Sequence, residues 1–448
     1  MKICMVSIRM TTPETCSTAV NFHDCQLAIV RDRAEKLSDI QKKAIAGDNN
    51  VINMLNITRE FIRRKRLVCY GGSAINDILP PDERFYDPVK DVPDYDFYSM
   101  NALDDAIELA DIFYKKGYAN IEAKSGVHHG TYKVFADFVP VADITQIPTQ
   151  LFKKLQKEAM VIKNIHYTPP DFLRMSMHLE LSRPLGDVSR WEKIAKRLEL
   201  LDRYYPIRGH VCTALPPSKM TGDTQNIQQT IFNIVNQQGG VFFGAFAAGM
   251  FLKNGRVGST PSFDVIVNEP SRVLDIVKAA LANRNLTLTV DHRKEAAELI
   301  PEHYILSVNG SARLYLYKPI ACHNYNVIKI NSFSVRVATI DTILAFYLAF
   351  VYVSGNDYNT NRLMCLSQQL HELHRNRHVS NKPIMRRYTL PCVGKQPTLR
   401  DMMVTRSKMH TTIKNKKSRE YMSWFLKYDP SAPRVSRSKK GGTRKNRK

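Results

Sequence analysis

Apolar residues in the first half of the chain change from helical to strand-like spacing at several points. Residues 27–65 repeat apolar side chains at every third or fourth position, with a break at residues 47–50, which predicts two helices. Short apolar or alternating runs predict strands at residues 67–70, 94–99, 131–139 and 141–144. Helical spacing returns between these strands and again over residues 170–205. This order predicts an α/β (α+β) fold in which helices flank a small mixed sheet.

The second half of the chain repeats this pattern weakly. Three pairs of segments align, namely 241–247 with 68–74, 261–265 with 93–97, and 313–317 with 131–139. The repeat predicts a duplicated unit whose second copy has lost most of the polar residues of the first. Four regions are therefore expected: a helical N-terminal segment (1–66), a first α/β domain (67–210), a degenerate second domain with C-terminal helices (211–430) and a basic disordered tail (431–448).

Positive charge is the unusual feature of the composition. The 448 residues include 65 Lys and Arg against 42 Asp and Glu, a formal net charge of +23, which predicts a phosphate-rich partner such as nucleic acid. The last fifteen residues hold eight basic side chains and no acidic one. Such a tail is expected to be disordered, and both a nucleic-acid-binding arm and a targeting or solubility tail remain open.

The cysteines and the apolar runs limit the classes of protein to which the chain can belong. The eight cysteines are scattered without a C-x-x-C pair, so neither a disulfide framework nor a zinc ribbon is expected, and a reducing compartment fits best. The longest apolar run, residues 343–353, is much shorter than the ~20 residues that a membrane span needs. No membrane association is therefore expected. The same run offers a surface for a homodimer, although burial within the second domain explains it equally well.

The candidate chemistry lies at the ends of the predicted strands. Gly71, Gly72 and Ser73 stand between the first strand and a helix, where two glycines allow the backbone N–H groups to approach a phosphate closely. Asp94 and Asp96 are two positions apart in the second strand, so both carboxylates face the same side. Two carboxylates so placed can share two divalent ions that hold the attacking and leaving oxygens of a phosphoryl transfer.

A third carboxylate is expected from a neighbouring strand. Asp143, at the end of the next alternating segment, is the first candidate, and Asp137 is the alternative because the sequence does not fix the register of that strand.

The order of these motifs resembles the nucleotidyltransferase superfamily that includes DNA polymerase beta. One departure is the long interval between Gly72 and Asp94, which implies a loop inserted beside the site at residues 80–93. Several motifs narrow the resemblance to the poly(A) polymerase catalytic subunits of large cytoplasmic DNA viruses. They are Y-G-G-S-A-I-N (70–76), P-D-Y-D-F-Y-S (93–99), G-T-Y-K-V (130–134), A-D-I-T (142–145), R-M-S-M-H-L-E-L-S-R-P (174–184) and R-W-E-K (190–193).

This resemblance implies a catalytic nucleotidyltransferase domain followed by a degenerate copy. It also implies transfer of AMP from ATP to an RNA 3′ end, with release of pyrophosphate and with Mg²⁺ or Mn²⁺ as cofactor. The predicted roles are metal binding and catalysis for Asp94, Asp96 and Asp143, and nucleotide binding for Gly71, Gly72 and Ser73. Basic residues of the second copy and around four arginines would track the RNA backbone; these are Arg375, Arg377, Arg386 and Arg387.

Other interpretations remain open at this point. The chain could be a terminal uridylyl- or CCA-adding nucleotidyltransferase, or an RNA-binding scaffold that has kept an inactive nucleotidyltransferase fold. A separate processivity subunit is a further possible partner. The expected location is the host cytoplasm, in a virus factory, with packaging in the virion as an alternative.

Overall fold

The computed structural model describes most of the chain between residues 22 and 432. The described ranges are 22–87, 89, 91–92, 95–209, 212, 222–252, 260–330, 333–353, 358–375 and 387–432. Asp94, the predicted domain boundary at residues 210 and 211, and all but the first two residues of the predicted tail lie outside them.

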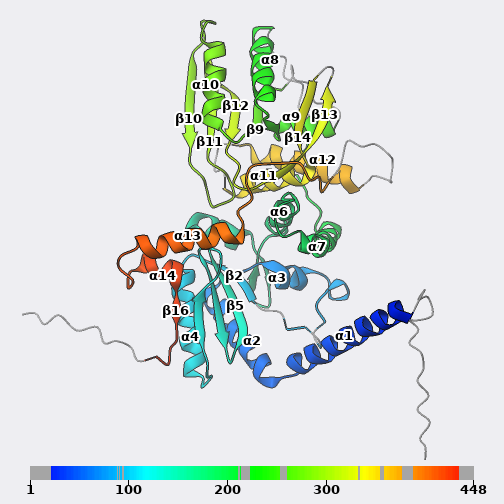
Figure 1. Ribbon diagram of the computed structural model, residues 1–448, viewed down its shortest axis with the longest axis vertical. Helices are drawn as coiled ribbons and strands as arrows, with labels where there is room; N and C mark the ends of the chain where they lie inside the picture. Colours follow the sequence, from blue (N-terminus) through cyan, green and yellow to red (C-terminus); the bar gives the residue numbers. More distant parts are fainter. Residues whose placement is uncertain are drawn as a thin grey trace, which may run out of the picture.

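Two mixed sheets of eight strands each form the two halves of the molecule (Figure 1). The first sheet has the order β16-β3-β4-β5-β2-β1-β7-β6. Its strands are β1 (Val68–Cys69), β2 (Tyr95–Ser99), β3 (Glu122–Ser125), β4 (Thr131–Ala136), β5 (Val139–Gln146), β6 (Met160–Ile162), β7 (Ile165–Tyr167) and β16 (Lys427–Tyr428). The helices of this half are α1 (Phe22–Ala46), α2 (Asn49–Lys65), α3 (Gly71–Ile78), α4 (Ala102–Lys115), α5 (Thr149–Glu158), α6 (Pro170–Leu181) and α7 (Trp191–Tyr204).

The second sheet has the order β10-β11-β12-β9-β8-β14-β13-β15. Its strands are β8 (Val241–Phe242), β9 (Phe263–Ile266), β10 (Leu288–Arg293), β11 (His303–Val308), β12 (Ser311–Tyr317), β13 (His323–Ile330), β14 (Phe333–Ala338) and β15 (Cys392–Val393). The helices of this half are α8 (Gly222–Gln237), α9 (Ala245–Phe251), α10 (Pro270–Leu281), α11 (Ile340–Val353) and α12 (Thr360–Arg375). The predicted fold class, mixed α/β with helices flanking the sheets, is confirmed.

The two sheets share their central strand pairing. In the first, β2 pairs antiparallel with β1 and parallel with β5; in the second, β9 pairs antiparallel with β8 and parallel with β12. One detail of the sequence alignment is wrong. Residues 313–317 belong to β12, which occupies the place of β5, whereas the sequence aligned them with the segment that becomes β4. Alternation alone could not separate two neighbouring strands.

Local sequence signals account for several boundaries of these elements. The predicted helix break holds, because α1 ends at Ala46 and the side chain of Asp48 accepts a hydrogen bond from the backbone N of Asn50, 2.8 Å away, at the start of α2. The single strand predicted over residues 131–139 is instead a hairpin. Asp137 and Phe138 have φ values of 46° and 67°, so the chain reverses there and β5 begins.

Helix α11 forms the seam between the two halves. It packs against α6 of the first half and α12 of the second, and all but two of its fourteen residues are buried. The apolar run that suggested a homodimer is therefore covered within the chain. Figure 1 shows α6, α7, α11 and α12 between the sheets, and α1 extending away from the body.

A buried ion cluster fixes this seam. Asp341 of α11 lies 2.9 Å from His178 Nδ1 of α6 and accepts hydrogen bonds from Arg387 at 2.6 and 2.7 Å. Burial alone would raise the pKa of Asp341, but Arg387 and His178 hold that pKa below its usual range. Arg387 is thus held inside the fold, which corrects its predicted place on an RNA track; Arg377 and Arg386 lie outside the described residues.

The C-terminal segment returns to the first half of the molecule. After β15, the chain forms α13 (Leu399–Thr412) and α14 (Arg419–Phe425), and then β16 pairs antiparallel with β3. The sequence placed these elements with the second domain. Their contacts with the first sheet connect residues about 300 positions apart in the chain, such as the 2.8 Å hydrogen bond from Ser125 Oγ to the carbonyl oxygen of Trp424.

Two further expectations concern cysteines and membranes. Among the described residues, the structure forms the disulfides Cys212–Cys365 and Cys322–Cys392, so the prediction of no disulfide framework is wrong. The two cysteines of each pair are 153 and 70 residues apart in the sequence, a separation at which cysteine spacing carries no signal.

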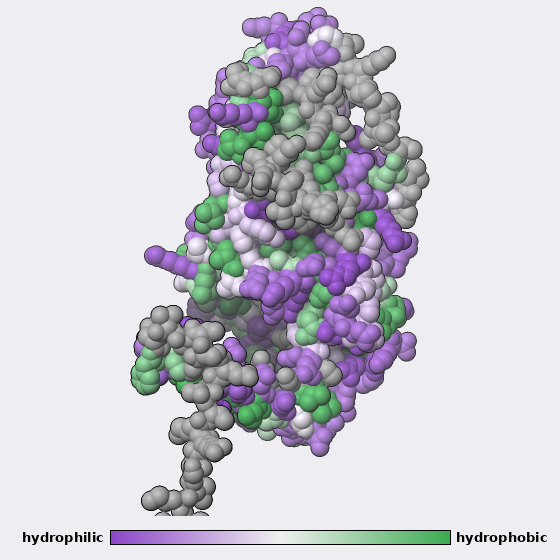
Figure 2. All heavy atoms as spheres, turned by 90° about the vertical axis from the view of Figure 1, so that its right-hand side faces the viewer, coloured by the Kyte–Doolittle hydropathy of each residue, from purple (hydrophilic) through white to green (hydrophobic). Residues whose placement is uncertain are grey.

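Across the described ranges, every helix is too short or too polar to cross a membrane. The face shown in Figure 2 is mostly hydrophilic, with small separate hydrophobic patches.

Removing the carboxylate of the ion cluster should destabilise the protein strongly. We expect Asp341→Ala to lower the free energy of unfolding by about 3–5 kcal/mol, because it leaves Arg387 buried without its partner. Chemical denaturation would measure the change. Asp291→Ala is a suitable control, since it breaks an exposed ion pair with Arg293 and should cost less than about 1 kcal/mol. Equal losses for the two variants would contradict the proposed importance of the seam.

Candidate active site

The turn between β1 and α3 brings Gly71 against Asp96. Gly71 has a φ of +73°, and a Cβ at this position would lie 2.4 Å from Asp96 Oδ2. The backbone N of Tyr70 also donates to the carbonyl oxygen of Asp96, at 2.9 Å. The turn therefore needs glycine for its backbone conformation and for its close approach to the carboxylate. Ser73, in the first turn of α3, is buried.

The register of two parallel strands places Asp96 beside Asp143. These residues are direct partners in the β2–β5 pair, where neighbouring strands lie about 4.8 Å apart. The strand neighbours of both are buried against the helices, whereas Asp96 and Asp143 themselves are partly exposed. Both carboxylates therefore lie on the face of the sheet opposite its helix-covered core.

The same register separates the two candidates for a third carboxylate. Asp143 is inside β5, opposite Asp96, while Asp137 is in the turn that precedes β5. One oxygen of Asp143 forms an ion pair with Lys133, and the other, Oδ1, is buried with no hydrogen-bond partner among the described residues. A buried carboxylate oxygen of this kind is unusual and is suited to a hard cation such as Mg²⁺ or Mn²⁺.

Asp94 is the remaining member of the predicted set of carboxylates. Asp94 lies outside the described residues, one position before β2. Within the described ranges, no group of three or more His, Cys, Asp or Glu side chains is arranged to hold a metal ion. Asp96, Asp143 and the unsatisfied Asp143 Oδ1 nevertheless provide oxygen donors that fit a divalent cation of the predicted type.

Arg197 is a charged residue at this site that the sequence did not reveal. A Cβ at Gly72 would lie 2.5 Å from Tyr86 Oη and 2.9 Å from Arg197 Nη1, so the guanidinium group packs against the glycine turn. Arg197 donates to Tyr86 Oη at 3.0 Å, and its guanidinium carbon lies 4.6 Å from the centre of the Phe85 ring. The inserted loop thus holds a buried cation beside the predicted phosphate-binding turn. The sequence alone does not distinguish Arg197 from the other basic residues of α7.

The second sheet shows what an altered copy of this site looks like. Asp264 of β9 corresponds to Asp96, and a Cβ at Gly244 would lie 1.8 Å from its Oδ2. The register partner of Asp264 is Tyr315, at the position that Asp143 occupies in the first sheet. Burial raises the pKa of Asp264 to about 7, and Tyr358 donates a hydrogen bond to it at 3.2 Å. The retained carboxyl group is packed in the core, and its register partner is a tyrosine in place of a second carboxylate.

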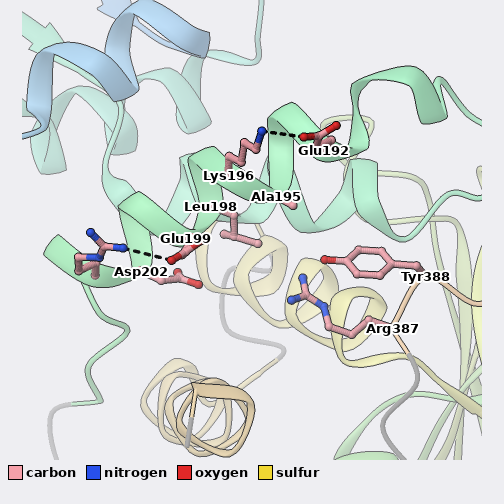
Figure 3. A pocket seen from close by; sticks show the side chains of 9 residues that line it. Glu192, Ala195, Lys196, Leu198, Glu199, Asp202, Arg387 and Tyr388 are labelled. Carbon is pink, nitrogen blue, oxygen red and sulfur yellow. Dashed lines mark hydrogen bonds and ion pairs between the residues drawn. The ribbon is translucent and has the colours of Figure 1, made fainter. Parts of the chain in front are cut away.

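A cavity of about 500 Å³ lies along α7. Figure 3 shows its lining, in which Lys196 pairs with Glu192 on one helix turn and Glu199 lies on another, while Arg387 and Tyr388 face them from the opposite side. Glu199 forms an ion pair with Arg203, which also lines the cavity. None of the residues predicted to bind metal or nucleotide lines this cavity.

The central strand pairing, the glycine turn and the adjacent carboxylates define a nucleotidyltransferase-like fold. Residues 56–187 match the family model described as poly(A) polymerase catalytic subunit. The crystal structure of the Megavirus polyadenylate synthase has the same fold, with a TM-score of 0.75 and 19% identity over 90% of this chain and 85% of that one. The family resemblance read from the motifs is confirmed for this region.

Two curated relatives agree with this match. The "Putative poly(A) polymerase catalytic subunit" of African swine fever virus (isolate Pig/Kenya/KEN-50/1950) is 34% identical over 174 residues, which is 38% of this chain and 36% of that protein. The protein of the same name from Acanthamoeba polyphaga mimivirus is 32% identical over 183 residues, which is 40% of this chain and 30% of that protein. The chain thus matches about a third of the length of these relatives.

Filling the glycine turn should cost more than a glycine replacement elsewhere. Gly117 is a matched control, because it also has a positive φ, +86°, but has no atom within 4 Å of a new Cβ. We expect Gly117→Ala to lower the free energy of unfolding by about 1–2 kcal/mol through backbone strain. Gly71→Ala should cost a further ~1–3 kcal/mol because Asp96 must move. Urea denaturation would compare them, and equal losses would refute the close contact.

The buried carboxyl of the second sheet predicts a pH dependence. Asp264 binds its proton more tightly when folded, so its contribution to stability is present below the unfolded pKa of ~3.9. That contribution should be lost as pH rises to about 7, the pKa of Asp264 in the folded protein, and should stay constant above it. The free energy of unfolding of wild type minus that of Asp264→Asn should therefore fall from pH 4 to pH 7. Asp275→Asn, at an exposed position, should show no such trend.

Proposed function

We propose that this protein is a template-independent poly(A) polymerase that transfers AMP from ATP to the 3′ end of mRNA and releases pyrophosphate. The observation that carries the proposal is the register of Asp96 with Asp143 beside the Gly71 turn. The family match over residues 56–187 supports the same reaction. The wider activity of the chain rests on these two observations.

The residues at the first sheet would have the following roles in this reaction. Asp94, Asp96 and Asp143 would hold Mg²⁺ or Mn²⁺, which when bound neutralises charge on the reacting oxygens. The backbone of Gly71 and Gly72 and the hydroxyl of Ser73 would bind the triphosphate. Arg197 adds a fixed positive charge beside Gly72, where it would stabilise the leaving pyrophosphate. Tyr86 and Phe85 orient Arg197.

Partners and location are part of this proposal. The relatives are named catalytic subunits, which supports a separate processivity subunit as a partner of this chain as well. The proposed location is the host cytoplasm at a virus factory, or the virion. The apolar surface of α11 gives no support for a homodimer, because that helix is buried within one chain.

A primer-extension assay tests the reaction. A short RNA labelled at its 5′ end would be given each nucleoside triphosphate separately with Mg²⁺ or Mn²⁺. We expect extension with ATP, and a loss of at least about 100-fold in rate for Asp96→Asn and Asp143→Asn. Asp137→Asn is the matched control and should stay within about 2-fold of wild type, because it changes a residue in the turn.

The other outcomes separate the remaining interpretations. Extension with UTP or CTP in place of ATP would indicate a uridylyl- or CCA-adding enzyme. Normal activity of Asp143→Asn together with inactive Asp137→Asn would reverse the carboxylate assignment. RNA binding without extension by any nucleotide would favour the scaffold interpretation.

A further inference from the structure

A row of charged residues crosses the first sheet at a single level of strand register. Each residue is the direct pairing partner of the next, from β2 through β5, β4 and β3 to β16. The row consists of Asp96, Asp143, Lys133, Lys124 and Lys427. Two carboxylates are thus followed by three lysines, which we name the lysine row.

All members of the row lie on the open face of the sheet. Residues that are direct partners across a sheet point to the same side. The strand neighbours of the lysines point the other way, because Tyr132, Val134 and Ala123 are buried in the core. Tyr428, next to Lys427, donates a hydrogen bond to Asp111 of α4 on the helix-covered side. Lys427 is therefore directed to the open face with the carboxylates.

The lysine row extends away from the site in even steps. Neighbouring strands are about 4.8 Å apart, so the lysines lie roughly 5, 10 and 14 Å from Asp143 along the sheet. This straight path suits a polymer with regularly spaced charges better than a small ligand. On its other side, β2 is paired with β1, and the turn that follows β1 contains Gly71 and Gly72. The lysines therefore lie on the side of the carboxylates away from the predicted triphosphate turn.

The positive charge of the row is accessible. The side chains of Lys133 and Lys124 are 40% and 42% exposed, and Lys427 is exposed with no ion pair to any described residue. Lys124 lies 2.6 Å from Glu122 and 4.3 Å from the centre of the Phe135 ring, on the same face. An aromatic ring beside lysines is a common arrangement for holding single-stranded nucleic acid.

The C-terminal segment is anchored so that it completes this row. Trp424 stacks on His129 with ring centres 4.0 Å apart, and Arg419 bonds to Asp104 at 2.6 Å. Arg406 donates to the carbonyl oxygen of Gly126 at 2.6 Å. These contacts fix the short strand β16, which brings Lys427 to the outer edge of the sheet. The basic residues of the chain terminus follow directly in the sequence.

We propose that the lysine row binds the backbone phosphates of a single-stranded RNA whose 3′ end lies at Asp96 and Asp143. The RNA then leaves the site across β4, β3 and β16. This inference rests on the proposed function for the position of the 3′ end. It moves the main RNA contact from the second domain, where the sequence placed it, to the first sheet.

Salt-dependent binding tests the lysine row without using catalysis. A 12-nucleotide oligo(A) labelled at its 5′ end would be titrated with full-length protein, without ATP or metal, at several salt concentrations. Each phosphate contact contributes about 0.7 to the slope of log affinity against log salt for a single strand. We expect Lys124→Gln/Lys427→Gln to reduce this slope by about 1.4. Replacement of both by arginine should restore it.

A matched double variant provides the control. Lys278→Gln/Lys329→Gln removes the same charge from two exposed positions of the second half and should leave the slope unchanged. Thermal unfolding would verify that all variants are folded. An unchanged slope in the lysine-row variant, a reduced slope in the control, or no RNA binding by wild type would each overturn the inference.

The binding assay tests the lysine row and the extension assay tests the polymerase function, so each claim can be refuted without the other. Extension with ATP by wild type, together with an unchanged slope in the lysine-row variant, would leave the proposed function standing and refute the row. A slope reduced by about 1.4 in a protein that extends no primer would support the row as an RNA site and refute the polymerase function.

Discussion

The parallel pairing of β2 with β5 is the constraint on which the candidate site depends. It sets Asp96 opposite Asp143 and, through β4, β3 and β16, places three lysines at the same level. Because side chains alternate between the two faces, a shift of β5 by one residue would turn Asp143 into the core. The buried neighbours Ala142 and Ile144 oppose such a shift, so the hydrophobic core of the sheet also fixes the position of the candidate carboxylate.

The second sheet keeps the same central strand pairing without the second carboxylate. Its strands have the same central pairing, and Gly244 still contacts Asp264. Tyr315 replaces the second carboxylate, and burial raises the pKa of Asp264. A single buried carboxyl group favours its neutral form, which does not suit the metal binding proposed for the two aspartates of the first sheet. The retained glycine and aspartate therefore serve packing in this half, and the same two residue types carry different roles in the two sheets.

Local features were predictable from the sequence, and long-range ones were not. The helix break at Asp48, the turn at Gly71 and the strand containing Asp96 follow from residue type and spacing. The register of Asp143 opposite Asp96 and the place of Asp137 in a turn could not be read from the sequence, because one predicted strand is split into two. The position of Arg197, the disulfides Cys212–Cys365 and Cys322–Cys392, and the return of β16 depend on contacts between distant parts of the chain, for which a single sequence carries no pattern.

The strand order itself separates the two substrates of the proposed reaction. From β1 to β16, the sheet presents the glycine turn with Arg197, then Asp96 and Asp143, then the lysine row. In a nucleotidyl transfer, the attacking hydroxyl and the leaving pyrophosphate lie on opposite sides of the reacting phosphorus. A cationic group on each side of the carboxylates meets this requirement, because the triphosphate and the RNA backbone would each have their own positive partner. The return of β16 extends the RNA side of this arrangement, and the inserted loop holds Arg197 on the nucleotide side.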